Sequence, residues 1–302
     1  MKFEAVVVCI NYSDFLKVTL PHSKHQFAKL VVVTDTKDIE TARVCEFYNV
    51  QCVKTDVFYR DGPIANKALG INEGLKYLTC DDWVIQMDAD IWLPPLTSNL
   101  LHRIPLEKDC LYGIDRMMCN SYNEWVNFVH SEGNNLVHEG WVYLHMHHFP
   151  IGQRIVDYNN DGYYPIGYFQ LWNPRGSGVK DYPVEIVGYD RTDVLHAKKF
   201  DRLHRKLIPD FVCIHLASEE HDMGQNWKGR KTKMFGPDRL QTLPQPKEIA
   251  VVTPIHEIID EPTVEEPVQP KVTKKTCCRC KLWRRFLNLF RKEDCIEPYP
   301  IK

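Results

Sequence analysis

The feature that constrains this chain most is an apolar run that ends in two carboxylates. Residues 83–90 read WVIQMDAD, and Pro94 and Pro95 follow shortly after. The run 83–87 predicts a buried central strand. Side chains alternate along an extended chain, so we expect Asp88 and Asp90 to share one side of it. Two adjacent carboxylates repel each other unless a positive charge lies between them.

A divalent cation that carries a diphosphate meets this need, because such cations prefer oxygen ligands and substrate phosphates complete their coordination. The carboxyl ends of strands are also where open α/β sheets bind ligands. The alternative interpretation is a solvated turn that happens to hold two acids. Taken alone, the Asp-X-Asp spacing of Asp88 and Asp90 favours this alternative, so the decision depends on other stretches.

The order of predicted elements indicates an α/β fold. Strands are predicted at 3–10, 30–33, 50–53 and 83–87, and helices at 13–25, 41–48 and 64–78. This alternation predicts a mostly parallel sheet with right-handed crossovers. Residues 110–190 are rich in Tyr, Trp, Gly and His, which predicts a mixed sheet with long loops. A helix at 193–203 and a strand at 211–214 complete the prediction.

Composition sets the class of protein and the predicted compartment. The chain is 44% hydrophobic and 26% charged with a net charge of −2, as in ordinary globular proteins. A net charge so close to zero produces no overall electrostatic field that would attract nucleic acid. The cysteines of the first part lie singly in apolar segments, which predicts reduced, buried thiols. With no run that fits a signal peptide or a membrane span, we expect a cytoplasmic protein.

Three regions are predicted along the chain. Residues 1–240 form the main domain, with a first half at 1–95 and a second half at 96–240. Residues 241–273 are rich in Pro and Glu and predict a linker without regular structure. Residues 274–302 form a basic tail with several cysteines.

The tail contains a predicted amphipathic helix within 277–292, with Trp, Phe and Leu on one face and Arg and Lys on its flanks. This profile indicates a helix that lies on anionic lipid, and acylation of the adjacent cysteines would add a second anchor. We therefore expect peripheral membrane association. A zinc site that includes Cys295, or docking onto a partner protein, are the alternatives.

Polar residues follow the first strands and begin the third helix. Asn11 and Asp35 stand at the ends of the first two strands, where a crossover fold meets base and ribose. Lys67 and Asn72 lie on the predicted helix just upstream of the Asp88 strand, where a lysine suits a diphosphate. The alternative is that Asn11 and Asp35 only form turns and that Lys67 is a solvated surface residue. No Gly-rich dinucleotide motif follows the first strand, which argues against a nicotinamide or flavin enzyme.

The ordered set of these motifs resembles the nucleotide-binding half of a GT-A fold glycosyltransferase, of the large family-2-like group. The resemblance implies that Asp88 and Asp90 form the DXD motif, with Asp90 as the more direct ligand of Mn²⁺ or Mg²⁺. It also implies that the nucleotide sugar contacts a set of residues on the first half of the chain, namely Asn11, Asp35, Lys67, Asn72 and Asp88.

The second half extends the resemblance. GYFQLW at 167–172 resembles the strand beneath the donor sugar, with Gln170 as its polar group. The stretch around Asp193 resembles the acidic segment whose Asp is the general base in inverting enzymes. Thr192 stands where Glu is usual, so Asp190 is a competing base and a simple helix cap at Asp193 is an alternative.

His215 follows a strand, and the resemblance implies that it is the third metal ligand. A loop that closes on the diphosphate is implied by Asn226, Trp227, Lys228 and Arg230. A rival cluster of histidines lacks Cys or acid at ligand spacing, so we expect a pocket wall rather than a zinc site. It comprises His138, His145, His147 and His148.

The predicted function is metal-dependent transfer of a hexose from a nucleotide sugar, a UDP-sugar in the first place, to an acceptor hydroxyl. Asp193 is the expected base if the reaction inverts. One alternative is a degenerate transferase domain that acts as a glycan-binding or membrane-docked scaffold. A sugar-1-phosphate nucleotidylyltransferase is less favoured, because it needs a Gly-rich loop where Asn11 and Tyr12 stand.

Overall fold

The computed structural model describes residues 1–62, 64–129, 155–156, 162–185, 191–218 and 231–237. All of them lie in one compact unit that spans Met1–Lys247. The predicted linker, 241–273, and the predicted tail, 274–302, lie outside the described residues.

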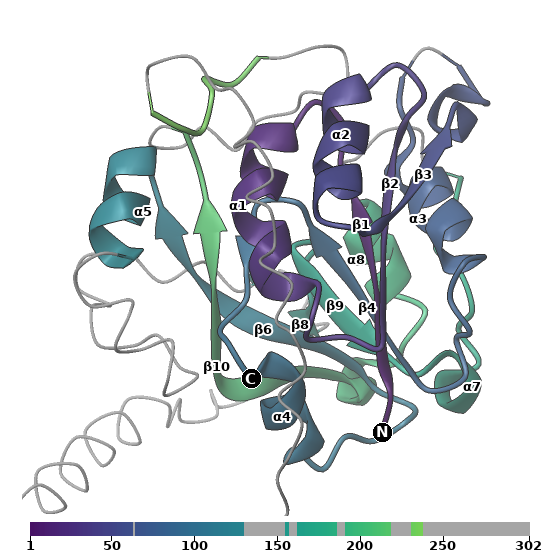
Figure 1. The fold of residues 1–302 in the computed structure, drawn as a ribbon. Helices are drawn as coiled ribbons and strands as arrows, with labels where there is room; N and C mark the ends of the chain where they lie inside the picture. Colours follow the sequence, from purple (N-terminus) through teal and green to yellow (C-terminus); the bar gives the residue numbers. More distant parts are fainter. Residues whose placement is uncertain (63, 130–154, 157–161, 186–190, 219–230, 238–302) are drawn as a thin grey trace, which may run out of the picture. The chain divides into compact units, whose positions relative to one another are not determined.

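The first half of the chain forms a parallel sheet with helical crossovers (Figure 1). Its strands stand in the order β3-β2-β1-β4, and each pairs in parallel with its neighbours. The elements are β1 (Phe3–Val8), α1 (Ser13–Ser23), β2 (Lys29–Asp35), α2 (Ile39–Phe47), β3 (Gln51–Thr55), α3 (Lys67–Leu75) and β4 (Trp83–Asp88). This confirms the predicted alternation of strands and helices.

The same sheet continues into the second half of the chain, where its strands run in both directions. β9 (Phe169–Trp172) lies antiparallel to β4 on one side and to β6 (Leu111–Cys119) on the other. β10 (Arg205–Leu216) pairs in parallel with β6 and antiparallel with β5 (Ile91–Trp92). The predicted mixed half is therefore confirmed as part of one sheet. A separate hairpin pairs β7 (Ile155–Val156) with β8 (Tyr163–Tyr164).

Helices cover both faces of the sheet and bury its β-branched residues (Figure 1). α1 and α2 pack on one face, and α3 and α8 (Thr192–Ala197) pack on the other. α3 approaches the strands closely because Gly74 faces them. A Cβ atom at Gly74 would lie 2.4 Å from Cγ2 of Val6 and 2.7 Å from Cγ2 of Val33.

A third apolar cluster lies around the far end of the sheet. α5 (Tyr122–Phe128) packs there against β5, β6 and β10, and Trp92 and Trp125 meet edge to face with ring centroids 5.6 Å apart. Short elements complete the described fold: η1 (Val57–Tyr59), α4 (Thr97–His102), α7 (Pro174–Ser177) and η3 (Arg202–His204).

Most predicted boundaries differ from the structure by a few residues, and two elements differ more. The helix predicted at 193–203 is α8, which ends at Ala197 and is followed by the short η3 turn. The strand predicted at 211–214 is β10, which is twelve residues long and has a register shift between Leu207 and Val212. The register shift interrupts the strand, so the apolar pattern of the sequence indicated only the part of β10 that follows it.

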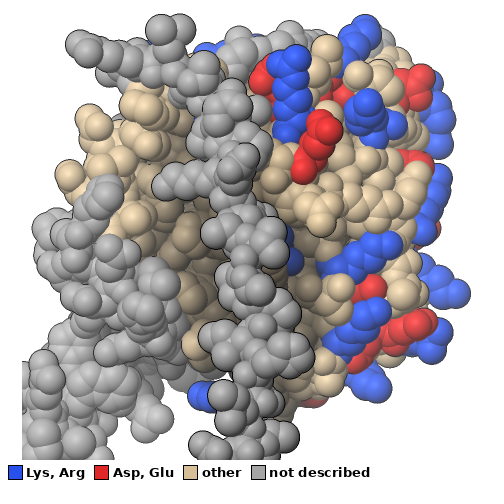
Figure 2. Space-filling model, viewed as in Figure 1, with Lys and Arg blue, Asp and Glu red and all other residues tan. Residues whose placement is uncertain are grey.

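The described surface carries mixed charges. On the face shown in Figure 2, acidic and basic side chains adjoin each other over the side that carries α2 and α3. Among the described residues, the structure contains no helix with the length and hydropathy of a membrane span. The described cysteines are all free.

Candidate active site

The candidate site lies at the carboxyl end of β4, beside the ends of β1 and β2. β4 ends at Asp88, and Asp90 lies in the turn that leads to β5. The extended strand that was expected to carry both carboxylates on one side therefore ends at Asp88. Each of the two carboxylates has a partner of its own.

Asp88 pairs with Lys67, the first residue of α3. Nζ of Lys67 lies 2.5 Å from Oδ1 of Asp88, and their side chains are 13% and 29% exposed. Asn66 positions Lys67 by capping the helix, since its Oδ1 accepts from the backbone N–H of Ala68 at 3.0 Å.

Charge keeps Lys67 protonated. Burial disfavours its ammonium form, but the negative charges of Asp88, Asp193 and Asp90 outweigh burial and raise the pKa of Lys67 above its ordinary value. Burial also raises the pKa of Asp88, and Lys67 offsets this only in part. The structure thus brings three predicted carboxylates around one predicted lysine.

Asp90 pairs with His215 on β10. Its Oδ2 lies 3.3 Å from Nε2 of His215, and the two side chains are 12% and 7% exposed. The other oxygen, Oδ1, is buried and has no hydrogen-bond partner in the described structure. A buried carboxylate oxygen without a partner is costly, so a ligand at this atom would relieve the cost.

Arg116 on β6 is a further member of the site that sequence reasoning missed. Its Nη1 lies 2.7 Å from Nδ1 of His215, and its guanidinium stacks 4.7 Å from the ring centroid of Tyr168. The hydroxyl of Tyr168 donates to the carbonyl oxygen of Ile114. Arg116 stands between Asp115 and Met117 in an ordinary strand, and no local motif marks it.

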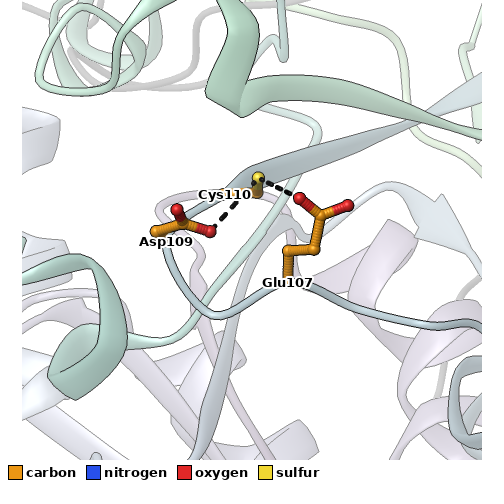
Figure 3. A group of neighbouring side chains, drawn as sticks. All are labelled: Glu107, Asp109 and Cys110. Atoms are coloured by element: carbon orange, nitrogen blue, oxygen red, sulfur yellow. Dashed lines mark hydrogen bonds between the residues drawn. The ribbon is translucent and has the colours of Figure 1, made fainter.

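The three metal ligands that the resemblance implies do not converge on one point. Among the described residues, Asp88, Asp90 and His215 do not offer three ligand atoms that lie within 4.8 Å of one another, whereas a different group does. That group comprises Glu107, Asp109 and Cys110 (Figure 3).

The Figure 3 group lies where β6 begins, whereas His215 pairs near the end of β6 at Met118. Its acids already have basic partners: Lys206 Nζ lies 2.6 Å from Glu107, and His204 Nε2 lies 3.3 Å from Asp109. It is therefore a charge-paired surface cluster, separate from the candidate site.

Asp193 and Gln170 meet on the α3 side of the sheet. Oδ2 of Asp193 accepts from the backbone N–H of Gly167 at 2.6 Å, and Oδ1 accepts from that of Val194 at 2.9 Å. Arg191, not Asp193, is the N-cap of α8. Nε2 of Gln170 donates to the carbonyl oxygens of Pro165 and Asp193. The buried amide of Gln170 therefore supports the loop that holds Asp193.

Asn72 holds a neighbouring loop. Its Nδ2 donates to the carbonyl oxygen of Tyr182 at 2.9 Å, and its Oδ1 accepts from the Tyr182 N–H at 2.8 Å. The Tyr182 hydroxyl in turn donates to Oε1 of Gln170 at 2.5 Å. Asn72 and Gln170, both predicted to bind the donor, thus have their amides bonded to the protein itself.

This loop also closes a pocket of about 420 Å³ against the outer side of α3. Leu69, Val184 and Lys199 are among the residues that line it. The ammonium of Lys199 is already paired with Asp181 at 3.0 Å.

A buried histidine supports the same loop and was also missed. His196 stacks on Tyr182 with ring centroids 3.8 Å apart and planes 5° apart, and Trp172 and Phe200 meet its ring edge to face. Burial, and secondarily the charge of Lys199, lower the pKa of His196 to about 3. The ring is therefore neutral in the folded protein at neutral pH.

Asp35 is the last residue of β2, as predicted, whereas β1 ends at Val8 and Asn11 lies in the turn that follows it. Asn11 has a left-handed backbone with φ of 57°, and its N–H donates to Oδ2 of Asp38 at 2.7 Å. Oδ1 of Asp35 accepts from the Lys37 N–H at 2.8 Å. Burial, with the nearby charge of Asp35 and a hydrogen bond to it, raises the pKa of Tyr59 to about 12.

Several predicted residues lie outside the described part of the chain. They are the competing base Asp190, the loop residues Asn226, Trp227, Lys228 and Arg230, and the histidines His138, His145, His147 and His148.

Comparison with known proteins gives a partial likeness of fold. Neither a family model nor a curated protein matches the chain. The solved structures that are similar to it include the following three. The mannosyltransferase PcManGT from Pyrobaculum calidifontis, in complex with GDP-Man and Mn²⁺, matches at 14% identity and a TM-score of 0.41 over 70% of this chain and 56% of that chain.

Glucosyl-3-phosphoglycerate synthase from Mycobacterium tuberculosis, in complex with Mn²⁺, UDP and phosphoglyceric acid, matches at 15% identity and a TM-score of 0.30, over 38% of this chain and 43% of that chain. The galactosyltransferase LgtC, with donor and acceptor sugar analogs, matches at 13% identity and a TM-score of 0.37, over 68% and 72%. The chain thus spans about half the length of the first two. TM-scores in this range describe a partial similarity of fold. The reaction has to be inferred from the residues of the candidate site.

Proposed function

We propose that the chain is a metal-dependent glycosyltransferase that moves a hexose from a nucleoside diphosphate sugar to an acceptor hydroxyl, with a UDP-sugar as the first donor to test. The observation that carries the proposal is the buried, unpartnered Oδ1 of Asp90 beside Asp88 at the carboxyl end of β4. A carboxylate pair in this place of an α/β sheet suits a cation that holds a diphosphate.

The residues present fit Mn²⁺ or Mg²⁺. Asp88 and Asp90 supply hard oxygen ligands, and Oδ1 of Asp90 lacks any other partner in the described structure. When bound there, the cation would neutralise charge on the diphosphate as it leaves. His215, the third implied ligand, has hydrogen-bonding partners that fit another role.

Lys67 is the proposed phosphate contact from the protein. It stands at the first position of α3, where the helix dipole favours an anion. Its ammonium now neutralises Asp88. A cation on the carboxylates would release Lys67 toward the diphosphate, because the two positive charges then compete for Asp88.

Asp193 is the proposed general base of an inverting reaction. Its carboxylate is half-buried, close enough to Lys67 for their charges to interact, and oriented by the Gly167 N–H. A carboxylate held in this way can take the proton of an acceptor hydroxyl while the hydroxyl oxygen attacks the sugar. The helices α3 and α8, which carry Lys67 and Asp193, pack on the same side of the sheet, and this supports a base close to the donor contacts.

The test is turnover of nucleotide sugars with Mn²⁺ by the full chain. Wild type should consume one donor in a Mn²⁺-dependent reaction, and Asp90→Ala should abolish it. Lys76→Met, a change at the exposed lysine that caps the C-terminus of α3, is the matched control and should retain turnover. Turnover by Asp90→Ala equal to wild type would contradict the proposal.

The basic tail at 277–292 extends the proposal to location, and it lies outside the described residues. We propose that it brings the enzyme to an anionic membrane surface. Co-sedimentation with vesicles that contain phosphatidylserine should fall sharply when residues 277–302 are removed. Equal co-sedimentation of both chains would contradict this role.

A further inference from the structure

The hydrogen bond between Arg116 and His215 determines which nitrogen of His215 carries a proton. Nη1 of Arg116 lies 2.7 Å from Nδ1 of His215. A guanidinium has five N–H donors and no acceptor, so Nδ1 must accept and therefore holds no proton. A neutral imidazole protonated at one nitrogen then carries its proton on Nε2. Nε2 lies 3.3 Å from Oδ2 of Asp90, within ion-pair distance of that carboxylate.

This arrangement is the reverse of a metal-binding histidine. A histidine that binds a cation through Nε2 uses the lone pair of that atom and donates its Nδ1–H to a carboxylate, a carbonyl or water. In this site a proton on Nδ1 would face the N–H of Arg116, donor against donor. The spacing of the implied ligands agrees, because Asp88, Asp90 and His215 do not converge within 4.8 Å in the described structure.

The fold holds Arg116 in place. Arg116 is opposite Cys213 and Met118 is opposite His215 in the parallel pair of β6 and β10, so Arg116 and His215 share a face. The Tyr168 ring supports the guanidinium from the neighbouring segment, with its own hydroxyl bonded to Ile114. No carboxylate among the described residues pairs with Arg116, so His215 is its hydrogen-bonded partner there.

We infer that Arg116 is a positioning residue that keeps His215 in the Nε2–H form, so that His215 holds Asp90 and does not bind the metal. The inference rests on the proposed function for the identity of the cation. His215 binds Oδ2 of Asp90, which leaves Oδ1 as the atom for the cation. Asp88 and Asp90 then provide the protein ligands, and donor phosphates and water complete the shell.

The first test reads the tautomer directly. Long-range ¹H–¹⁵N correlation spectra of the full chain, labelled with ¹⁵N-histidine and assigned with His215→Asn, distinguish Nε2–H from Nδ1–H. Wild type should show Nε2–H, and diamagnetic Mg²⁺ should leave this proton in place. Arg116→Lys keeps a donor and should keep the tautomer. Arg116→Gln offers an amide oxygen and should shift it toward Nδ1–H.

The second test measures Mn²⁺ affinity by titration calorimetry. Loss of a residue that only orients a ligand also weakens metal binding by about tenfold or more, so the comparison uses His215→Gln, whose side-chain amide keeps an N–H donor for Asp90. We expect a loss of about tenfold or more for Asp90→Asn and an affinity within about twofold of wild type for His215→Gln. An Nδ1–H form in wild type, or a tenfold loss with His215→Gln, would overturn the inference. Absence of Mn²⁺ binding by wild type would instead contradict the proposed function, while the spectra still decide the tautomer.

Discussion

Acid should destabilise this protein through one buried ring, His196. Its pKa falls from 6.5 to about 3 on folding, because burial disfavours the imidazolium and Lys199 adds to the effect. Since the folded state has the lower pKa, the unfolded chain takes up the proton first as the pH falls. Stability from this group is therefore complete above about pH 6.5 and is lost progressively down to about pH 3.

The magnitude follows from this difference in pKa. Between about pH 7 and about pH 5 the unfolded state gains nearly one proton at this site, which costs the fold about 2 kcal/mol. For a domain of this size, that corresponds to a fall in Tm of roughly 4–8 °C. The consequence reaches the site, because His196 stacks on Tyr182 and Tyr182 binds Gln170.

The assay is thermal unfolding of wild type and His196→Phe at both pH values. Phenylalanine keeps an aromatic ring against Tyr182 and removes the titrating group, so the variant should lose about 2 kcal/mol less stability than wild type on acidification. His25→Gln, a change at an exposed histidine, controls for removal of a histidine. If His196→Phe and wild type lose the same stability, the reasoning is refuted.

Two further substitutions test the site and its support. Lys67→Met leaves Asp88 and its neighbouring carboxylates without their cation and should cost roughly 2 kcal/mol of unfolding free energy, part of which saturating Mn²⁺ restores. Lys76→Met, whose side chain is 67% exposed, is the control, and equal denaturant midpoints for the two variants would contradict the ion-pair account. Gly74→Ala should cost about 1–3 kcal/mol through overpacking against Val6 and Val33, despite the helix propensity of alanine. Unchanged stability of Gly74→Ala in chemical denaturation would show that α3 can move away from the sheet.

Local pattern was sufficient for the first half of the fold. Short apolar runs predicted the strands β1, β2, β3 and β4. The amphipathic segments between these runs predicted the helices α1, α2 and α3. The insertion of β9 between β4 and β6 depends on pairing between residues far apart in the chain, which no local pattern encodes. The same is true of the extent and register shift of β10.

The site shows the same division. Asp88, Asp90 and Lys67 were predicted from strand-end and helix-start positions, and the structure brings them together. Arg116 was missed because its contact with His215 spans 99 residues and arises only when β6 and β10 pair. Asn72 and Gln170 were chosen as donor contacts by motif, and their hydrogen bonds to Tyr182 became visible only with the fold.

The most direct test of the central claim is a thermal-shift panel of nucleoside diphosphates and nucleotide sugars, each with and without Mn²⁺. A ligand that binds only the folded state at 100 times its Kd adds about 2.7 kcal/mol. For a domain of this size the increase in Tm is roughly 5–10 °C. We predict such an increase for one nucleotide, dependent on Mn²⁺ and absent in Asp90→Asn. No increase with any nucleotide in the presence of Mn²⁺ would contradict a donor site at Asp88 and Asp90.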